Sequence, residues 1–137
     1  MVDSRHDLAL VSYESPFGSS PRPLQTESAR PRVGEPLALI GIPAISQSPL
    51  SGLSGFHGSP TISPGIVRAT DQTQQLTSPD GVPETLTDAI RVTTPGTLSG
   101  ESGGPAIDAA GKVVGVIEGG GFGFTTLTPV ADLRSLY

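Results

Sequence analysis

The sequence predicts an all-β protein, an antiparallel six-stranded β-barrel followed by a short C-terminal helix. Short apolar runs of Val, Ile, Leu and Ala recur along the chain, and clusters of turn-forming residues separate them. The 18 glycines and 14 prolines stand mostly between these runs, which is typical of strands joined by turns rather than of low-complexity sequence. At 137 residues the chain has the length of a single domain.

A polar segment separates the first two expected strands. The run DLALVSY at residues 7–13 predicts a strand close to the N-terminus. Residues 14–32 are rich in Pro and Ser, so we expect a linker that crosses the surface. The run EPLALIGIP at residues 35–43 is almost continuous in apolar residues, which predicts a strand buried on both faces.

The middle of the chain contains two more expected strands. Residues 44–60 predict a long loop of Gly, Ser and Pro, and loops of this length are commonly functional or mobile. The run TISPGIVRAT at residues 61–70 predicts a strand with a bulge or bend at its Pro-Gly pair. Residues 71–87 predict a polar connection, and DAIRV at residues 88–92 predicts a short strand.

The C-terminal part predicts a hairpin, a last strand and a helix. Residues 105–118 alternate as a hairpin does, with the turn at Ala110 and Gly111. The run GFGFTTL at residues 121–127 predicts the last strand. Thr128 is then expected to be the N-cap of a helix whose first residue is Pro129.

Composition excludes several classes of function. The net charge is −5 and the eight basic residues are scattered, so we expect no nucleic-acid partner. The chain has no apolar run of about 18 residues that would cross a membrane, and no secretory signal follows Met1. It has no cysteine, and its two histidines lack the spacing of metal ligands. We therefore expect neither a metal ion nor another cofactor.

The stretch GTLSGESGGPAI at residues 96–107 sets one serine, Ser102, among glycines. It fits the G-x-S-x-G elbow of α/β-hydrolases, but that elbow needs a helix directly after the serine, and here Pro105 and a hairpin pattern follow. It also fits G-x-S-G-G-P, in which tight folding converges the amides of Gly100 and Ser102 on one point, an oxyanion hole. The alternative without chemistry is a serine in a glycine-rich turn.

This loop and its surroundings resemble the trypsin-like serine peptidases, in particular the bacterial branch that includes the HtrA proteases. Five segments are similar to the family's in the same order: DSRHDLALV, RVGEPLALIGIPA, TISPGIVRAT, SGESGGPAIDAAGKVVGVI and GFGFTTLTPVADLRSL. The resemblance covers the C-terminal half of the family's domain. It implies that residues 1–32 are a remnant strand of a first barrel with its linker, and that residues 33–137 are the second barrel.

The resemblance also implies site residues. Ser102 is the expected nucleophile, Gly100 and Ser102 the oxyanion donors, and Asp7 the carboxylate that orients a general-base histidine. The expected pocket has no acid at its base and suits a small or medium apolar P1 residue rather than Arg or Lys; its residues are Gly96, Ile117, Glu118, Gly123 and Phe124. Glu101 departs from the Asp or Asn that is usual before the nucleophile, and we expect its longer side chain to shift the oxyanion loop.

The general base is not expected within the chain. His6 neighbours Asp7, and neighbouring strand residues point to opposite faces, so the two side chains cannot meet. His57 falls in the long loop at residues 44–60, where nothing nearby would fix its tautomer. A histidine-bearing upstream segment or a partner chain is needed to complete the site, and the isolated chain is expected to have little activity.

Two functions of different classes follow. The first is a serine endopeptidase that forms an acyl-enzyme with a peptide or protein substrate, present here as a partial domain. The second is a non-catalytic peptide-binding or scaffolding pseudoprotease, and a fragment with no independent role is a third reading. By family resemblance the protein is exported or sits in the cell envelope, although residues 1–137 contain no signal peptide.

Overall fold

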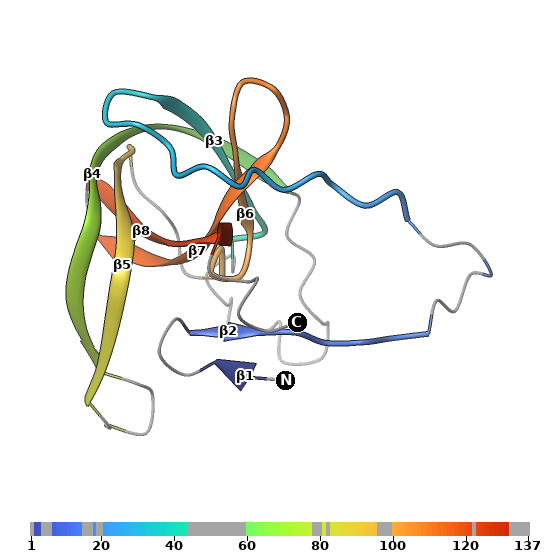
Figure 1. The fold of residues 1–137 in the computed structure, drawn as a ribbon, viewed down its shortest axis with the longest axis horizontal. Coiled ribbons are helices and arrows are strands. Elements are labelled where there is room, and N and C mark those ends of the chain that lie inside the picture. The colour runs from blue at the N-terminus through green and yellow to red at the C-terminus, as the bar shows by residue number, and fades with distance from the viewer. Residues whose placement is uncertain are drawn as a thin grey trace, which may run out of the picture.

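The computed structural model describes residues 2–3, 7–14, 18, 21–43, 60–77, 81, 83–95, 100–121 and 123–131. The strands of this part of the chain are β1 (Val2–Asp3), β2 (Leu8–Ala9), β3 (Pro36–Gly41), β4 (Thr61–Thr77), β5 (Pro83–Thr93), β6 (Pro105–Ile107), β7 (Val113–Gly121) and β8 (Phe124–Pro129). Strands β3 to β8 form a closed antiparallel barrel in the order β3-β4-β5-β8-β7-β6 (Figure 1). The prediction of an all-β fold with six antiparallel strands is confirmed.

The barrel interior is aliphatic. Along β3, Leu37 and Leu39 are buried, while Ala38 and Ile40, which alternate with them, are only partly buried. Side chains alternate between the faces of a strand, so one face of β3 packs inward and the other faces out. The prediction that β3 is buried on both faces was therefore wrong. The core cluster consists of Leu37, Leu39, Val67, Ile90, Val92, Ala106, Val114, Ile117 and Leu127.

Strands β4 and β5 are much longer than the sequence predicted. β4 continues to Thr77 and β5 begins at Pro83, so residues 71–77 and 83–87 are strand and not a polar connection. Backbone pairing does not require apolar side chains, and the glutamines here lie on a largely exposed part of the sheet. The irregularities of register lie between Val67 and Gln74. Pro64 and Gly65, where a bulge was expected, pair regularly with β3.

The C-terminal hairpin is confirmed, and the expected helix start is not. β6 and β7 pair across a turn in which the amide of Gly111 donates to the carbonyl of Asp108 at 3.0 Å. β8 runs through Thr128 and Pro129, and Thr128 pairs with Val116 of β7. Thr128 is thus a buried strand residue rather than an N-cap, because pairing with β7 satisfies its backbone. A short 3₁₀ turn follows at residues 130–131, and residues 132–137 lie outside the described part.

The N-terminal residues form a separate two-stranded sheet. The predicted strand at residues 7–13 is limited to β2, and β1, which was not predicted, pairs with it. This small sheet lies outside the ring of the barrel (Figure 1). Leu8 is buried, whereas Val11 and Tyr13 farther along are 77% and 68% exposed. No helix long and apolar enough to cross a membrane occurs among the described residues.

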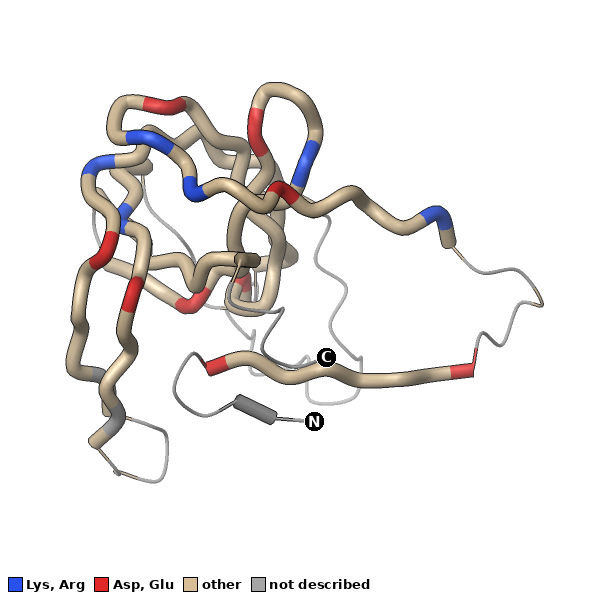
Figure 2. Tube along the Cα trace, in the orientation of Figure 1, with Lys and Arg blue, Asp and Glu red and all other residues tan. Residues whose placement is uncertain are grey.

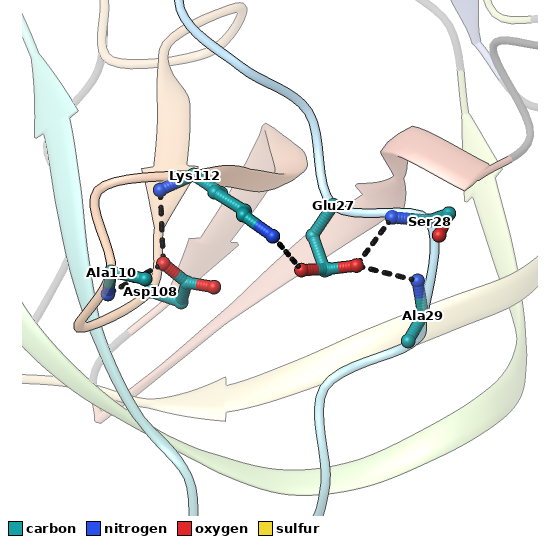
Figure 3. A network of polar contacts seen from close by, with 6 residues as sticks. All are labelled: Glu27, Ser28, Ala29, Asp108, Ala110 and Lys112. Carbon is teal, nitrogen blue, oxygen red and sulfur yellow. Dashed lines mark hydrogen bonds and ion pairs between the residues drawn. The ribbon is translucent and has the colours of Figure 1, made fainter.

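Residues 21–32 cross the surface, as predicted, but they are tied to the barrel. The amide of Glu27 donates to the carbonyl of Val113 at 2.9 Å, and the amide of Val113 donates to the carbonyl of Gln25 at 2.8 Å. The Lys112 ammonium forms an ion pair with the Glu27 carboxylate, with 2.7 Å between Nζ and Oε2. Figure 3 shows this contact with its neighbours. Elsewhere, basic and acidic residues are intermixed over the barrel (Figure 2), and Arg30 pairs with Asp71 and Asp88.

Candidate active site

Ser102 stands at the corner of a tight turn. The amide of Gly104 donates to the carbonyl of Glu101 at 3.1 Å, which closes a four-residue turn with Ser102 and Gly103 at its centre. Gly103 has φ 86°, the value that a type II turn demands at its third position and that L side chains rarely adopt. The exposed Ser102 side chain therefore stands on a turn that the glycines make possible.

Two backbone hydrogen bonds attach this turn to β7. The amide of Gly103 donates to the carbonyl of Ile117 at 2.7 Å, and the amide of Ile117 donates to the carbonyl of Gly104 at 2.8 Å. On the opposite side, the turn lies directly against β3, because a Cβ on Gly104 would overlap the carbonyl oxygen of Ile40. Only glycine fits at this position, so the G-G of the motif is explained by the turn and by this close approach.

The Ser102 hydroxyl donates a hydrogen bond of 2.6 Å to the backbone carbonyl oxygen of Glu118 on β7. A carbonyl accepts a hydrogen bond but does not take up the proton at neutral pH, so this partner does not activate the hydroxyl. A Cβ built on Gly119 would lie 4.0 Å from Oγ, an ordinary van der Waals contact, so no side chain of residue 119 covers the hydroxyl. Because Ser102 is exposed, another acceptor can approach its hydroxyl from solvent.

The amides of Gly103 and Gly104 are not candidates for an oxyanion hole, because they donate to Ile117 and Glu101. The amides of Gly100 and Ser102, which the sequence predicted as donors, stay the candidates in this loop. An open, largely apolar pocket of about 360 Å³ adjoins them. Its lining residues are Ile40, Gly41, Ile42, Pro60, Gly100, Glu101, Ser102, Gly104 and Pro105.

The Glu101 side chain extends from the turn at Glu101–Gly104 towards the beginning of β4. Its side chain is buried, with 5% of the residue exposed, and its Oε1 accepts a hydrogen bond of 2.9 Å from the hydroxyl of Thr61. The sequence singled out Glu101 as unusual but gave no signal for Thr61, which lies 40 residues earlier in the chain.

Asp7 lies in the turn between β1 and β2, with φ 48° and an exposed side chain. A carboxylate in a triad acts on the histidine rather than on the serine, so its role depends on a ring placed between the two. His6 and His57 both lie outside the described residues, as does Gly96 of the expected pocket.

The remaining predicted pocket residues lie in two places, beside the turn that carries Ser102 and at the connection from β7 to β8. Ile117 and Glu118 contact the turn at Glu101–Gly104 through their backbone, and the Ile117 side chain is in the barrel core. Gly123 forms the turn between β7 and β8 with φ 85°. The ring of Phe124 packs under the guanidinium of Arg91, 4.1 Å from the ring centroid. In the part of the chain that the structure describes, no group of three or more His, Cys, Asp or Glu residues could hold a metal ion.

Comparison with known proteins identifies the family to which the chain belongs. The family model of the trypsin-like peptidase domain matches residues 1–116. No curated protein matches the chain. Among solved structures, Deg5 is 22% identical with a TM-score of 0.69 over 98% of this chain and 55% of its own.

Two other solved structures match similarly. The active form of the Rv3671c protease from M. tuberculosis is 24% identical, with a TM-score of 0.66 over 84% of this chain and 46% of its own. The MamO protease domain from Magnetospirillum magneticum is 18% identical, with a TM-score of 0.59 over 83% of this chain and 51% of its own. The chain thus spans about half the length of the structures it matches, and these likenesses show the fold.

Proposed function

Because the chain belongs to the trypsin-like peptidase domain family, as its sequence resemblance predicted, we propose that it is the nucleophile-bearing part of a serine endopeptidase. The general base is a histidine outside residues 1–137, carried by a preceding segment or by a partner chain. The observation that carries the proposal is the turn at Glu101–Gly104, which leaves the Ser102 side chain exposed.

The reaction is acyl transfer. The histidine takes the proton from Ser102 Oγ as this oxygen attacks the scissile carbonyl carbon, and the same proton then goes to the leaving amine. The amides of Gly100 and Ser102 stabilise the negative oxygen that forms on the substrate carbonyl. Water, deprotonated by the histidine, releases the acyl group from Oγ. Asp7 holds the histidine ring in the tautomer that this sequence needs.

Reaction requires a change at Ser102. Its hydroxyl donates to the Glu118 carbonyl, and a general base accepts the same proton only after the hydroxyl has rotated. Ser102 is exposed, and Gly119 has no side chain that would oppose this rotation.

For the substrate we propose a peptide with a small or medium apolar P1 residue, bound by the predicted pocket residues Gly96, Glu118, Gly123 and Phe124 and by the backbone of Ile117, whose side chain lies in the barrel core.

A second candidate function is a non-catalytic peptide-binding protein of the same fold. The hydrogen bond from Ser102 to a carbonyl favours it, because a serine held in this way binds without reacting. The two functions differ in whether Ser102 becomes a nucleophile when a base is supplied.

Imidazole added to the solution tests this directly, because it supplies the missing base. We expect imidazole to accelerate labelling of Ser102 by a fluorophosphonate, measured as an adduct on the peptide that contains residues 100–107. The Ser102→Ala variant should carry no adduct, and the exposed Ser28→Ala variant should label as the wild type does. Labelling that stays slow in the presence of imidazole, or that is spread over several serines, would favour the non-catalytic function.

A further inference from the structure

Glu101, the residue directly before Ser102 in the sequence, has a buried side chain. Burying a carboxylate is unfavourable unless hydrogen bonds replace its water, so the groups around it reveal what the residue does. Its Oε1 accepts from the Thr61 hydroxyl at 2.9 Å. The same hydroxyl lies 3.3 Å from the carbonyl oxygen of Gly41. Because a hydroxyl has one proton, the shorter contact marks Glu101 as its main acceptor.

Thr61 is well placed to be an anchor. It is the first residue of β4 and pairs with Gly41, the last residue of β3. Its backbone is therefore fixed by the barrel, whereas Glu101 lies in the irregular segment before β6. The hydrogen bond thus connects the turn at Glu101–Gly104, called the nucleophile turn from here on, to the paired strands β3 and β4.

Gly41 shows how closely the two segments meet. A Cβ on Gly41 would lie 2.7 Å from the Cβ of Glu101, closer than side-chain carbons pack. The Glu101 side chain therefore rests on bare backbone at the end of β3. Three residues later, Gly104 rests on the carbonyl of Ile40 in the same way.

The nucleophile turn consequently has an attachment on each side of Ser102. On its C-terminal side, Gly103 and Gly104 bond to Ile117 of β7. On its N-terminal side, the Glu101 side chain accepts the hydrogen bond from Thr61. Gly100, whose amide we propose as an oxyanion donor, has φ 96° and lies next to Glu101 on that second side.

We propose that Thr61 and Glu101 are a positioning pair, which fixes the peptide units of Gly100 and Ser102 for the oxyanion. Neither residue reacts; both act through the turn. The proposal deepens the proposed function and rests on it for the identity of the positioned amides. It also gives a reason for glutamate here, because aspartate, one methylene shorter, does not reach Thr61 from the same backbone.

Five variants test the pair. Thr61→Val removes the hydroxyl and keeps the shape, Thr61→Ser keeps the hydroxyl, Glu101→Gln keeps the length and an acceptor oxygen, and Glu101→Asp shortens the side chain. Thr85→Val is the matched control, since this exposed threonine on β5 donates to Gln75 at 3.2 Å and lies in no part of the site.

Two measurements are made on each variant: amide hydrogen exchange, and the imidazole-dependent labelling rate of Ser102. We expect Thr61→Val and Glu101→Asp to speed exchange at Gly103 about tenfold and to slow labelling by a similar factor, as loss of one buried hydrogen bond implies. Exchange at Val114 and Val116 of β7 should not change. Thr61→Ser, Glu101→Gln and Thr85→Val should resemble the wild type.

Several results would overturn the positioning pair. One is a Thr61→Val variant that matches Thr85→Val in both measurements. Another is faster exchange that is equal in the turn and in β7, because the role is then general stability. A third is faster exchange at Gly103 with unchanged labelling. If the wild type itself does not label with imidazole, the proposed function fails, and exchange at Gly103 still decides whether the pair fixes the turn.

Discussion

Ser102 and Glu118 are joined by a short hydrogen bond, 2.6 Å from the serine Oγ to the backbone carbonyl oxygen. The nucleophile turn and β7 thereby hold the hydroxyl in an orientation in which no base receives its proton. The carbonyl and a general base compete for the one proton of the hydroxyl, so the base accepts it only after the bond to Glu118 is broken. The consequences of this arrangement, and of the way the turn is attached, can be measured.

The first prediction concerns the contact of the turn with β3. Gly104→Ala should destabilise the protein by about 1–3 kcal/mol, as overpacking does, because its Cβ would overlap the Ile40 carbonyl. Gly111→Ala is the control. It meets no atom within 4 Å, but its φ of 78° is strained for alanine and should cost about 1 kcal/mol. Urea unfolding gives the loss in free energy of unfolding for each variant. Equal losses would contradict the prediction, because they would mean that the turn can shift away from the Ile40 carbonyl at little cost.

The second prediction concerns the N-terminal sheet. A two-stranded sheet is marginally stable alone, and residues 10–14 are exposed and outside any strand. Amides from Leu8 to Tyr13 should therefore exchange faster than those from Val113 to Ile117, which lie between β6 and β8. The measurement is made at low protein concentration, so that pairing with a second chain does not protect the exposed strand edge. Equal protection under these conditions would contradict the prediction.

The third prediction concerns the ion pair that ties residues 25–29 to the β6–β7 hairpin. The hydrogen bond from Lys112, with smaller effects from the amides of Ala29 and Ser28, lowers the pKa of Glu27 from 4.5 to about 2. The pKa of Lys112 is raised, mainly by its hydrogen bond to Glu27. Because the carboxyl pKa is lower in the folded state, its contribution is complete above pH 4.5 and is lost as the pH falls towards about 2.

The same reasoning gives the alkaline limit. The raised pKa of Lys112 contributes stability below its ordinary value of 10.5, and this is lost as the pH rises through the folded-state pKa. Glu27→Gln should lower the midpoint of urea unfolding slightly at neutral pH, and the difference from the wild type should vanish near pH 2. The exposed Glu14→Gln is the control. A difference that persists at the acid limit would mean that packing, and not charge, holds the segment.

The sequence predicted the barrel because its core strands carry apolar residues at the expected spacing. It underestimated β4 and β5, since residues such as Gln72 and Gln75 are polar and their strand conformation depends on pairing across the hairpin. It also favoured a helix after Thr128, where local capping preference is strong. Pairing of Thr128 with Val116 overrides that preference, and no local pattern reveals it.

The site was predictable to a similar extent. The glycines around Ser102 have a local cause, a turn with positive φ, and local causes leave a motif in the sequence. The contacts of Glu101 with Thr61 and Gly41 have no such motif, because they join segments that meet only in the folded barrel. Glu101 was recognisable as a departure from the family pattern, but its partner Thr61 could be identified only from the folded structure.

Fluorophosphonate labelling of the isolated chain without imidazole shows whether Ser102 is a nucleophile whose base lies outside residues 1–137. We expect slow labelling at Ser102, and peptide turnover that Ser102→Ala changes little, since a site without its triad keeps only about 10³–10⁴-fold over the uncatalysed reaction. Rapid labelling of the lone chain that is lost in His57→Ala would contradict this expectation and identify His57 as the base.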